Sequence, residues 1–515
     1  MKTLFAVSLG VAVVLVVFLV WQPATETEGV MVYCAAGMKK PVEEIARAYE
    51  KELGVKVRLE FRGSRTLLAN FKVVQQGDLY IPGDDYYIEL ARDEGYIDEV
   101  IPIARMTPVF AVQKGNPKKI QSLDDLLNGK VRVAQTDPQQ AACGRLTKKV
   151  LEKLGKWQEL DKITNQTGVY KPNVIDVATD VKVGAVDVGI VWDSTVAQFQ
   201  PDLEAVEFPE LKDHASQVTV GVLRFTKSPP DALRFARYLT SEKGLPIFEK
   251  YGFKVVEGDQ WAVTPELKLF AGAMLRPAIQ ETIREFEKRE GVKVTTVYNG
   301  CGILVAQMRT KGERPDAYFA CETSFMQKVS DLFLDPTDVS QNRLVIVVPK
   351  GNPKNIKTLE DLARPGLRIG VGHEQKCAMG AITKQTLEKT PFYDKIMKNV
   401  LENGVQSPTG DLLINQMVTG SLDAVIAYVS NAAMAADKLD AYTIEGIPCA
   451  IATQPFAVGK NSKYKHLSNR LLEAIKTAQS KKRFEEFGFK WKLKEGQSKN
   501  SPAGDSVNQT GHRSE

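Results

Sequence analysis

The sequence predicts an α/β protein of two tandem domains, each built of two lobes with a hinge and a central cleft. Segments of the first half return in the second about 236 residues later, as KGNPKKIQSLDDL at Lys114 returns as KGNPKNIKTLEDL at Lys350. A repeat this long is a whole domain with its own core. Strands alternate with helices, which is typical of parallel sheets covered by helices. Extended segments at 108–114 and 221–225 are placed to pass between lobes, and two crossings make a hinge.

The first copy opens with an apolar strand over Val30 to Tyr33 and a turn of small residues. Apolar residues at helical spacing predict a helix from about Val42, and Gly54 ends it. A second strand, Val55 to Phe61, leads into the turn Gly63-Ser64 and another helix.

Later segments of the copy keep the same alternation. Val131 to Ala134 and Val186 to Trp192 read as buried strands, and Val174 to Val183 reads as a helix. Asp411 to Val418 and Asp423 to Tyr428 are the corresponding helix and strand of the second copy. Ligands of such sheets bind at the carboxyl ends of strands, where small-residue turns open helices.

Composition and charge limit the classes of function that the protein can have. The chain has 515 residues, 43% apolar and 25% charged, with a formal net charge of +5, which suits two globular cores. Basic residues are dispersed among acidic ones, so we expect no nucleic-acid partner.

The N-terminus predicts export. Lys2 precedes an uncharged, mainly apolar run from Thr3 to Trp21, long enough to span a bilayer. Residues 1–28 are therefore either an uncleaved inner-membrane anchor or a cleaved signal peptide, with the rest of the chain outside the cytoplasm. We expect domains over 29–258 and 259–493, and a disordered tail over 494–515.

Four turns at strand ends predict the site of each copy. In the first copy they are Ala36 to Met38, Gly63 to Arg65, Gln139 to Gly144 and Trp192 to Ser194. Free backbone N–H groups and the positive ends of helix dipoles would face one cleft, so the ligand that suits them is a small anion. No Ser-His-Asp constellation, paired-carboxylate pattern or phosphate-loop motif repeats between the copies, so we expect a binding protein and not an enzyme, with no cofactor and no metal.

The turns carry a resemblance to a known family. FAGAMLRPAI at Phe270, FRGSRTLLAN at Phe61, TDPQQAACG at Thr136, GIVWDSTV at Gly189 and YGF at Tyr251 resemble the periplasmic molybdate-binding proteins of ABC importers, which have the type II solute-binding fold. The resemblance covers nearly the whole chain twice. It implies a tandem duplication of such a protein, which captures molybdate, tungstate or a similar oxyanion and delivers it to an ABC permease.

The resemblance also implies the ligand contacts, although the two copies differ in them. The family's second-turn serine falls on Ser64 in the first copy and on Cys301 in the second, and its tyrosine falls on Trp192 and Tyr428. The candidate ligand-binding residues are Gly37, Met38, Gly63, Ser64, Ala142, Cys143, Val174 and Trp192 in the first copy, and Ala273, Met274, Gly300, Cys301, Ala378, Met379 and Tyr428 in the second.

The cysteines leave alternatives open. Outside the cytoplasm they usually form disulfides, and the pairs Cys301–Cys321 and Cys34–Cys143 are possible, besides simple packing. A soft-ligand site for a thiophilic metal or a thiol-reactive oxyanion is the other reading, because Cys301, Cys321 and Cys377 all fall near the second cleft. Two further functions therefore stand beside transport: a membrane-anchored sensory or scavenging module, and a metal-handling or thiol-redox protein.

Overall fold

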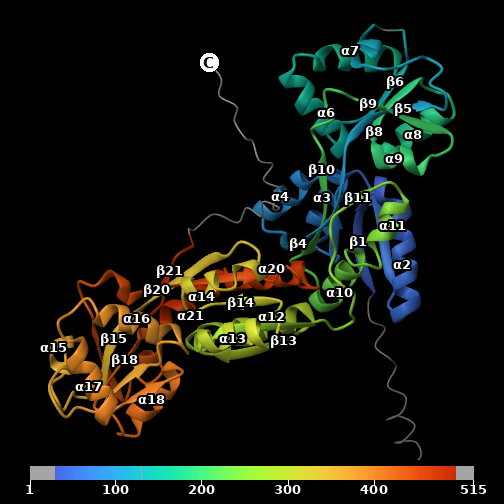
Figure 1. Cartoon of the computed structure of the whole chain (residues 1–515). Helices are drawn as coiled ribbons and strands as arrows, with labels where there is room; N and C mark the ends of the chain where they lie inside the picture. Colours follow the sequence, from blue (N-terminus) through green and yellow to red (C-terminus); the bar gives the residue numbers. More distant parts are fainter. Residues whose placement is uncertain (1–28, 129, 494–515) are drawn as a thin grey trace, which may run out of the picture. The chain divides into compact units, whose positions relative to one another are not determined.

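The computed structural model describes residues 29–128 and 130–493 (Figure 1). The predicted anchor or signal peptide over 1–28 and the predicted tail over 494–515 lie outside the described residues. Within the described ranges, no helix combines the length and apolar character that crossing a membrane requires. The described residues divide into two compact units, of which the first holds 29–265 together with 287–293, and the second holds 266–286 and 294–493.

Lobe one of the first unit is a mixed sheet with the strand order β11-β4-β10-β3-β1-β2. Its strands are β1 (Val30–Ala35), β2 (Val57–Arg62), β3 (Leu79–Ile81), β4 (Ile97–Met106), β10 (Ser216–Leu223) and β11 (Lys254–Val255). Its helices are η1 (Ala36–Met38), α2 (Lys39–Leu53), α3 (Ser64–Val74), α4 (Asp85–Asp93), α10 (Pro229–Leu239) and α11 (Leu245–Lys250). β1 runs parallel to both β2 and β3, so the turns that follow these strands meet at one edge of the sheet.

Lobe two of the first unit has the strand order β7-β6-β8-β5-β9. Its strands are β5 (Pro108–Gln113), β6 (Val133–Thr136), β7 (Val169–Lys171), β8 (Val188–Trp192) and β9 (Leu203–Glu207). Its helices are α5 (Leu123–Leu127), α6 (Ala142–Lys153), α7 (Trp157–Thr167), α8 (Val174–Lys182) and α9 (Asp193–Gln198). β8 is fully buried, as its uninterrupted apolar run predicts.

The chain crosses between these lobes twice. The first crossing lies at Thr107, between β4 and β5, close to the predicted segment 108–114. The second prediction, 221–225, was wrong, because β10 lies wholly in lobe one, where it pairs with β3 and β4. The crossing lies earlier, in residues 208–215 between β9 and β10.

The second unit repeats both sheets. Lobe one contains β12 (Glu266–Gly272), β13 (Lys293–Asn299), β14 (Ala317–Phe319), β20 (Ile451–Val458), β21 (Lys490–Trp491) and the first half of β15 (Thr337–Pro349). Lobe two contains β16 (Ile369–Gly372), β17 (Val405–Ser407), β18 (Ala424–Tyr428), β19 (Leu439–Thr443) and the second half of β15. β15 is continuous through the crossing, whereas Pro108 stands where the first unit divides the same path into β4 and β5.

The helices of the second unit follow the same order. In lobe one they are η2 (Ala273–Leu275), α12 (Arg276–Glu290), α13 (Cys301–Thr310), α14 (Thr323–Gln327), η3 (Ser330–Leu332), α20 (Lys465–Ile475) and α21 (Ala478–Glu486). In lobe two they are α15 (Leu359–Leu362), α16 (Ala378–Leu387), α17 (Tyr393–Asn403), α18 (Gly410–Val418) and α19 (Val429–Ala433), with η4 (Pro448–Ala450) before β20.

Local sequence explains where these helices begin and end. Gly54 ends α2 in the left-handed region, with φ of 71°, which glycine adopts without a Cβ penalty. Asn173 caps α8 by accepting from two backbone amides, and Asp84 and Glu322 cap α4 and α14. The predicted helix from Val174 is confirmed.

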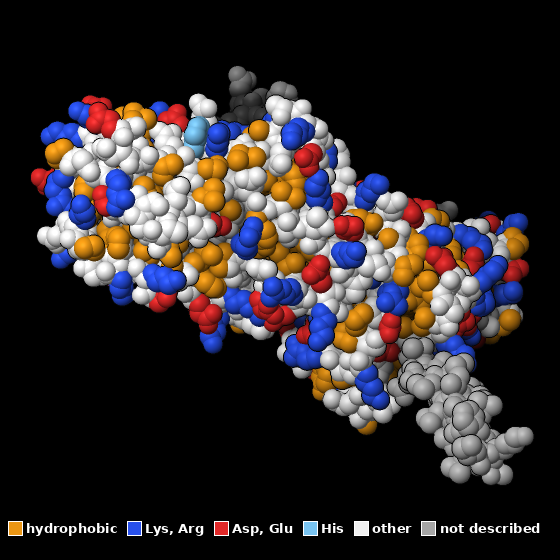
Figure 2. Space-filling model, turned by 90° about the horizontal axis from the view of Figure 1, so that it is seen from below, with side chains coloured by type: hydrophobic (Ala, Val, Ile, Leu, Met, Phe, Trp, Pro, Cys, Tyr) orange, Lys and Arg blue, Asp and Glu red, His pale blue; other side chains and the backbone are white. Residues whose placement is uncertain are grey.

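The surface mixes both signs of charge. On the face that Figure 2 shows, Lys and Arg side chains are interspersed with Asp and Glu side chains over both units. That face offers no extended basic stripe of the kind nucleic-acid binding uses.

Candidate functional site

The first unit has a small cavity of about 20 Å³ between its two lobes. All eight candidate residues of the first copy line it. The complete lining is Ala35, Ala36, Gly37, Met38, Arg62, Gly63, Ser64, Gly83, Met106, Ala141, Ala142, Cys143, Asn173, Val174 and Trp192. Lobe one supplies the turns after β1 and β2, and lobe two supplies the turn before α6 and the end of β8.

Three helices begin at this cavity. Ser64, Ala142 and Val174 are the first residues of α3, α6 and α8. The first backbone amides of a helix have no intrahelical acceptor, so those of Ser64 and Ala142 can serve a ligand. One such amide already joins the lobes, because the Arg65 N–H donates to the Gln140 carbonyl at 3.2 Å.

Ser64 is the polar side chain best placed to bind an anion here. It is 2% exposed, and its Oγ accepts from the Gly83 N–H at 3.0 Å. Tyr80 also fixes the position of Ser64, because the Tyr80 hydroxyl donates to the Ser64 carbonyl at 2.7 Å. With a lone pair of Oγ engaged by Gly83, the hydroxyl proton is free to donate to a ligand.

The two lobes of the first unit are closed on each other. A Cβ added at Gly63 would lie 2.6 Å from the Gln140 carbonyl oxygen and 2.8 Å from that of Pro172. A Cβ at Gly37 would lie 3.1 Å from Val174 Cγ2. Glycine at these turns therefore permits close approach of one lobe to the other.

An ion pair spans the cleft beside the cavity. Arg145 Nη2 on α6 lies 2.6 Å from Asp84 Oδ2 at the start of α4, and the two side chains are 18% and 4% exposed. The Arg145 guanidinium also stacks over the Tyr86 ring, 4.0 Å from its centroid. None of Asp84, Arg145 and Gly83 is among the candidates that the sequence predicts for this site. The strand-end turn after Tyr80, which repeats at Tyr318, was the pattern that could have led to Gly83 and Asp84.

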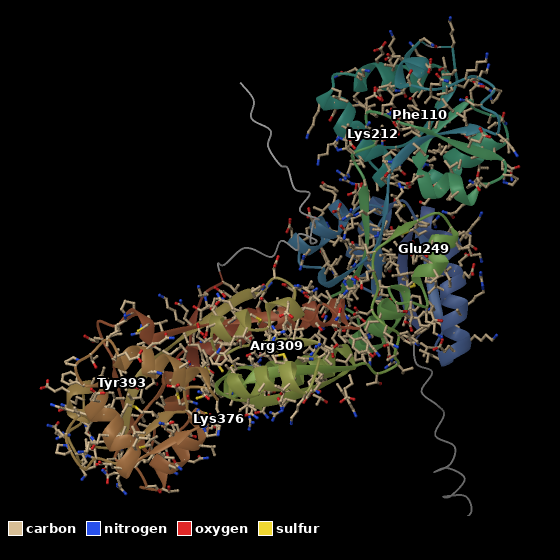
Figure 3. The ribbon with its side chains drawn as sticks, viewed as in Figure 1. Phe110, Lys212, Glu249, Arg309, Lys376 and Tyr393 are labelled. Carbon is tan, nitrogen blue, oxygen red and sulfur yellow. The ribbon has the colours of Figure 1, made fainter. Side chains whose placement is uncertain are left out.

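The second unit assembles its candidates at the corresponding positions. Gly300 and Cys301 begin α13, Ala378 and Met379 begin α16, and Tyr428 ends β18. Ala273 and Met274 lie in η2, which contacts α18 and α19. A Cβ at Gly300 would lie 2.4 Å from the Lys376 carbonyl oxygen, so these lobes are also closed; Lys376 is labelled in Figure 3.

All six cysteines are free thiols. Neither predicted disulfide alternative, Cys301–Cys321 or Cys34–Cys143, is formed. Cys34 is fully buried in β1, where its Sγ contacts the Ala35 carbonyl at 3.5 Å. Burial raises the pKa of both the Cys34 and the Cys143 thiol.

Cys301 and Cys321 are neighbours. The Cys321 N–H donates to Cys301 Sγ at 3.0 Å. The corresponding hydrogen bond of the first unit runs from the Gly83 N–H to Ser64 Oγ. Burial raises the pKa of Cys301, but hydrogen bonds from Cys321 and Tyr318 outweigh it, so that pKa is lowered. The hydrogen bond to Cys301 and burial raise the pKa of Cys321.

Tyr428 is 2% exposed, and its hydroxyl has no hydrogen-bond partner among the described residues. Burial and then the three nearby thiols Cys321, Cys377 and Cys301 raise its pKa, so the hydroxyl keeps its proton and can donate. Over 29–128 and 130–493, no group of three or more His, Cys, Asp or Glu side chains is arranged to hold a metal ion.

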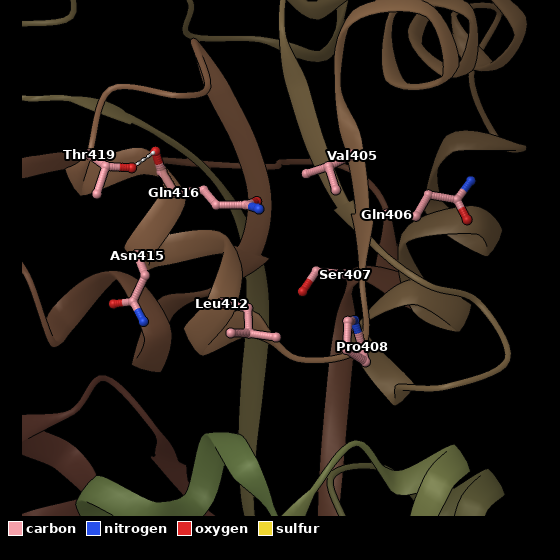
Figure 4. Close-up of a pocket in the computed structure, with 8 residues that line it drawn as sticks. All are labelled: Val405, Gln406, Ser407, Pro408, Leu412, Asn415, Gln416 and Thr419. Atoms are coloured by element: carbon pink, nitrogen blue, oxygen red, sulfur yellow. Dashed lines mark hydrogen bonds between the residues drawn. The ribbon is translucent and has the colours of Figure 1, made fainter.

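A second cavity, of about 310 Å³, lies in lobe two of the second unit (Figure 4). β17 and α18 line it, with Ser407 on the strand and Gln416 on the helix facing the space. In the first unit the corresponding residues are Lys171 and Asp180, which form an ion pair of 2.7 Å. The Gln416 Oε1 is buried without a partner among the described residues. The cavity therefore lies where the first unit has the Lys171–Asp180 ion pair.

Comparison with known proteins identifies the family. The model of the bacterial extracellular solute-binding protein family matches residues 30–254 and again residues 267–490. The chain belongs to this family, twice over. This confirms the predicted tandem duplication and the predicted two-domain α/β fold.

The relatives include molybdate-binding proteins. The molybdate-binding protein ModA of Mycobacterium bovis is 27% identical over 225 residues, which is 43% of this chain and 83% of that protein. ModA of Escherichia coli is 27% identical over 235 residues, 44% of this chain and 89% of that protein. The solved periplasmic molybdate-binding protein of Azotobacter vinelandii is 19% identical with a TM-score of 0.37, and covers 44% of this chain and 100% of its own.

Proposed function

We propose that this protein is an extracytoplasmic solute-binding protein that captures a small oxyanion of the molybdate class in its first unit and offers it to an ABC permease. The observation that carries the proposal is the closed cavity around Ser64. There, one uncharged hydroxyl with a free proton and the first amides of two helices converge from both lobes. Such donors suit the oxygens of a tetrahedral anion and supply no catalytic base or nucleophile.

Charge and small side chains support the same ligand. Asp84, a carboxylate beside the cavity, is paired with Arg145, so its charge does not oppose an anion. Small residues such as Ala142 and Gly63 let ligand oxygens reach the backbone. Closure of one lobe on the other is the hinge motion by which solute-binding proteins enclose a ligand.

The proposal also includes a location at the inner membrane, next to the permease. A protein of this family acts outside the cytoplasm, and the apolar run over 3–21 would hold it at the inner membrane beside its permease. Fractionation of cells that express the full chain tests the anchor, because an uncleaved anchor leaves the whole protein in the membrane fraction. Release of a shortened protein into the periplasm would contradict it.

Calorimetry tests the ligand. We expect the purified full chain to bind molybdate and tungstate in the micromolar range or tighter, and sulfate and phosphate more weakly. Ser64→Ala should abolish or strongly weaken the molybdate heat. Absence of a heat for all four anions, or a heat that Ser64→Ala leaves unchanged, would overturn the assignment of the cavity.

A further inference from the structure

The second unit carries two neighbouring thiols at the positions where the first unit presents its anion-binding hydroxyl. The Ser64 and Gly83 positions are occupied by Cys301 and Cys321, and the same backbone-to-side-chain hydrogen bond of 3.0 Å links each pair. The scaffold therefore forces the two sulfurs to be adjacent once both positions are cysteine.

A compensating change admits the second sulfur. A Cβ placed on Gly272 would lie 2.1 Å from Cys321 Sγ and 3.2 Å from Cys301 Sγ, so only glycine fits there. The first unit has Ala36 at this position, where Gly83 leaves the corresponding space empty. Cys321 Sγ thus occupies the place of the Ala36 methyl group, and Ala36 lines the cavity of the first unit.

The third thiol approaches from the other lobe. Cys377 stands at the position of Ala141, which also lines the first cavity. A Cβ on Gly300 would lie 3.2 Å from Cys377 Cβ, which places this cysteine across the closed cleft from α13. All three thiols are at most 5% exposed.

We propose that the cleft of the second unit binds a thiol-reactive, trivalent oxyacid of the arsenite type through Cys301 and Cys321. The proposal deepens the proposed oxyanion-binding function by giving the second cleft its own ligand class. The adduct forms without redox chemistry: two As–S bonds form, two As–O bonds break, and each thiol proton leaves with a hydroxide as water. One hydroxyl of As(OH)₃ remains, and the unpartnered Tyr428 hydroxyl can bond to it.

The surroundings favour a neutral oxyacid over a metal cation or a dianion. The described residues provide no three-ligand metal group, and helix N-termini disfavour cations. Glu322 is close enough to Tyr428 to raise the pKa of its hydroxyl. A carboxylate at this place opposes a dianion, whereas As(OH)₃ is uncharged at neutral pH.

The test titrates arsenite into the full chain kept reduced with a phosphine, following As–S absorbance in the near ultraviolet. We expect one equivalent to bind and to protect Cys301 and Cys321 from alkylation, mapped by mass spectrometry on unmutated protein. Cys301→Ser and Cys321→Ser should each weaken binding more than tenfold. Cys449→Ser is the matched control, because that thiol is half-buried in η4 and lies 3.8 Å from Thr386 Oγ1.

A gain-of-function variant makes the test independent of folding losses. Ala36→Gly, Ser64→Cys and Gly83→Cys together copy the thiol pair into the first unit, where a Cβ at Gly83 meets no atom closer than 3.5 Å. Arsenite stoichiometry should rise from one to two while molybdate binding is lost. Absence of arsenite binding in the reduced wild type, or binding without protection of Cys301 and Cys321, would overturn the inference. Molybdate binding to the wild type is read separately, so failure of either proposal is distinguishable.

Discussion

Ser64→Ala gives the sharpest test of the first cleft. The substitution removes one donor to a charged ligand, a hydrogen bond that contributes about 1.5–3 kcal/mol. The dissociation constant for molybdate should therefore rise roughly 10- to 150-fold, measured by calorimetry. The substitution also leaves the Gly83 N–H without the acceptor that now lies 3.0 Å away. Some loss of stability, about 1–3 kcal/mol, should accompany the loss of affinity.

Ser216→Ala separates these two effects. The Ser216 hydroxyl donates to the carbonyl of the same Gly83 at 3.1 Å, but Ser216 does not line the cavity. Its removal should lower the midpoint of thermal unfolding by a similar amount and leave the molybdate affinity within threefold. Equal losses of affinity in both variants, or less than a threefold loss in Ser64→Ala, would refute the assignment of Ser64 as a donor.

Three further experiments test the Arg145–Asp84 ion pair, the closure of the lobes and the cavity of the second unit. Arg145→Ala should leave the Asp84 carboxylate buried without its partner in the closed form, at a cost of about 3–5 kcal/mol. Ligand release should then be at least tenfold faster in stopped-flow measurements. Arg145→Lys should have a smaller effect on the release rate, and an unchanged rate in Arg145→Ala would contradict the role of the ion pair. Gly63→Ala should weaken ligand binding because its Cβ would lie 2.6 Å from a carbonyl oxygen of the other lobe; an unchanged affinity would be evidence against tight closure. Ser407→Lys with Gln416→Asp should rebuild the first unit's ion pair in the second unit. A gain of about 1 kcal/mol should raise the midpoint of thermal unfolding of the second unit by about 2–4 °C. Calorimetry that finds no rise would contradict the correspondence between this cavity and the Lys171–Asp180 pair.

The repeat made the fold predictable, because each element was read twice in different sequence. The buried strand ending at Trp192 and its counterpart ending at Tyr428 both occur as predicted. The second lobe crossing was not predictable from composition. The run over 221–225 is apolar and extended, which suits a strand inside a sheet as well as a connection, and only pairing with β3 and β4 distinguishes the two.

The site was predictable where it rests on turns and not where it rests on side chains from distant segments. The eight candidates of the first copy line one cavity because each follows a strand or opens a helix. Arg145 and Asp84 are paired only because the lobes close, and their separation of 61 residues carries no pattern. Ser64 and Gly83 likewise meet only because β1 pairs with both β2 and β3.

The differences between the clefts are coupled, which argues that the second site was remodelled and not merely eroded. Loss of function alone would leave independent substitutions, yet the gain of Cys321 requires the loss of a methyl group at Gly272, since the two cannot share that space. The Arg145 position is Ala381 in the second unit, so the Glu322 carboxylate there lacks the partner that neutralises Asp84. A cleft that gains thiols and keeps an unneutralised carboxylate has become less suited to a dianion and more suited to an uncharged, thiol-reactive oxyacid. A second cleft with its own ligand would account for both differences together.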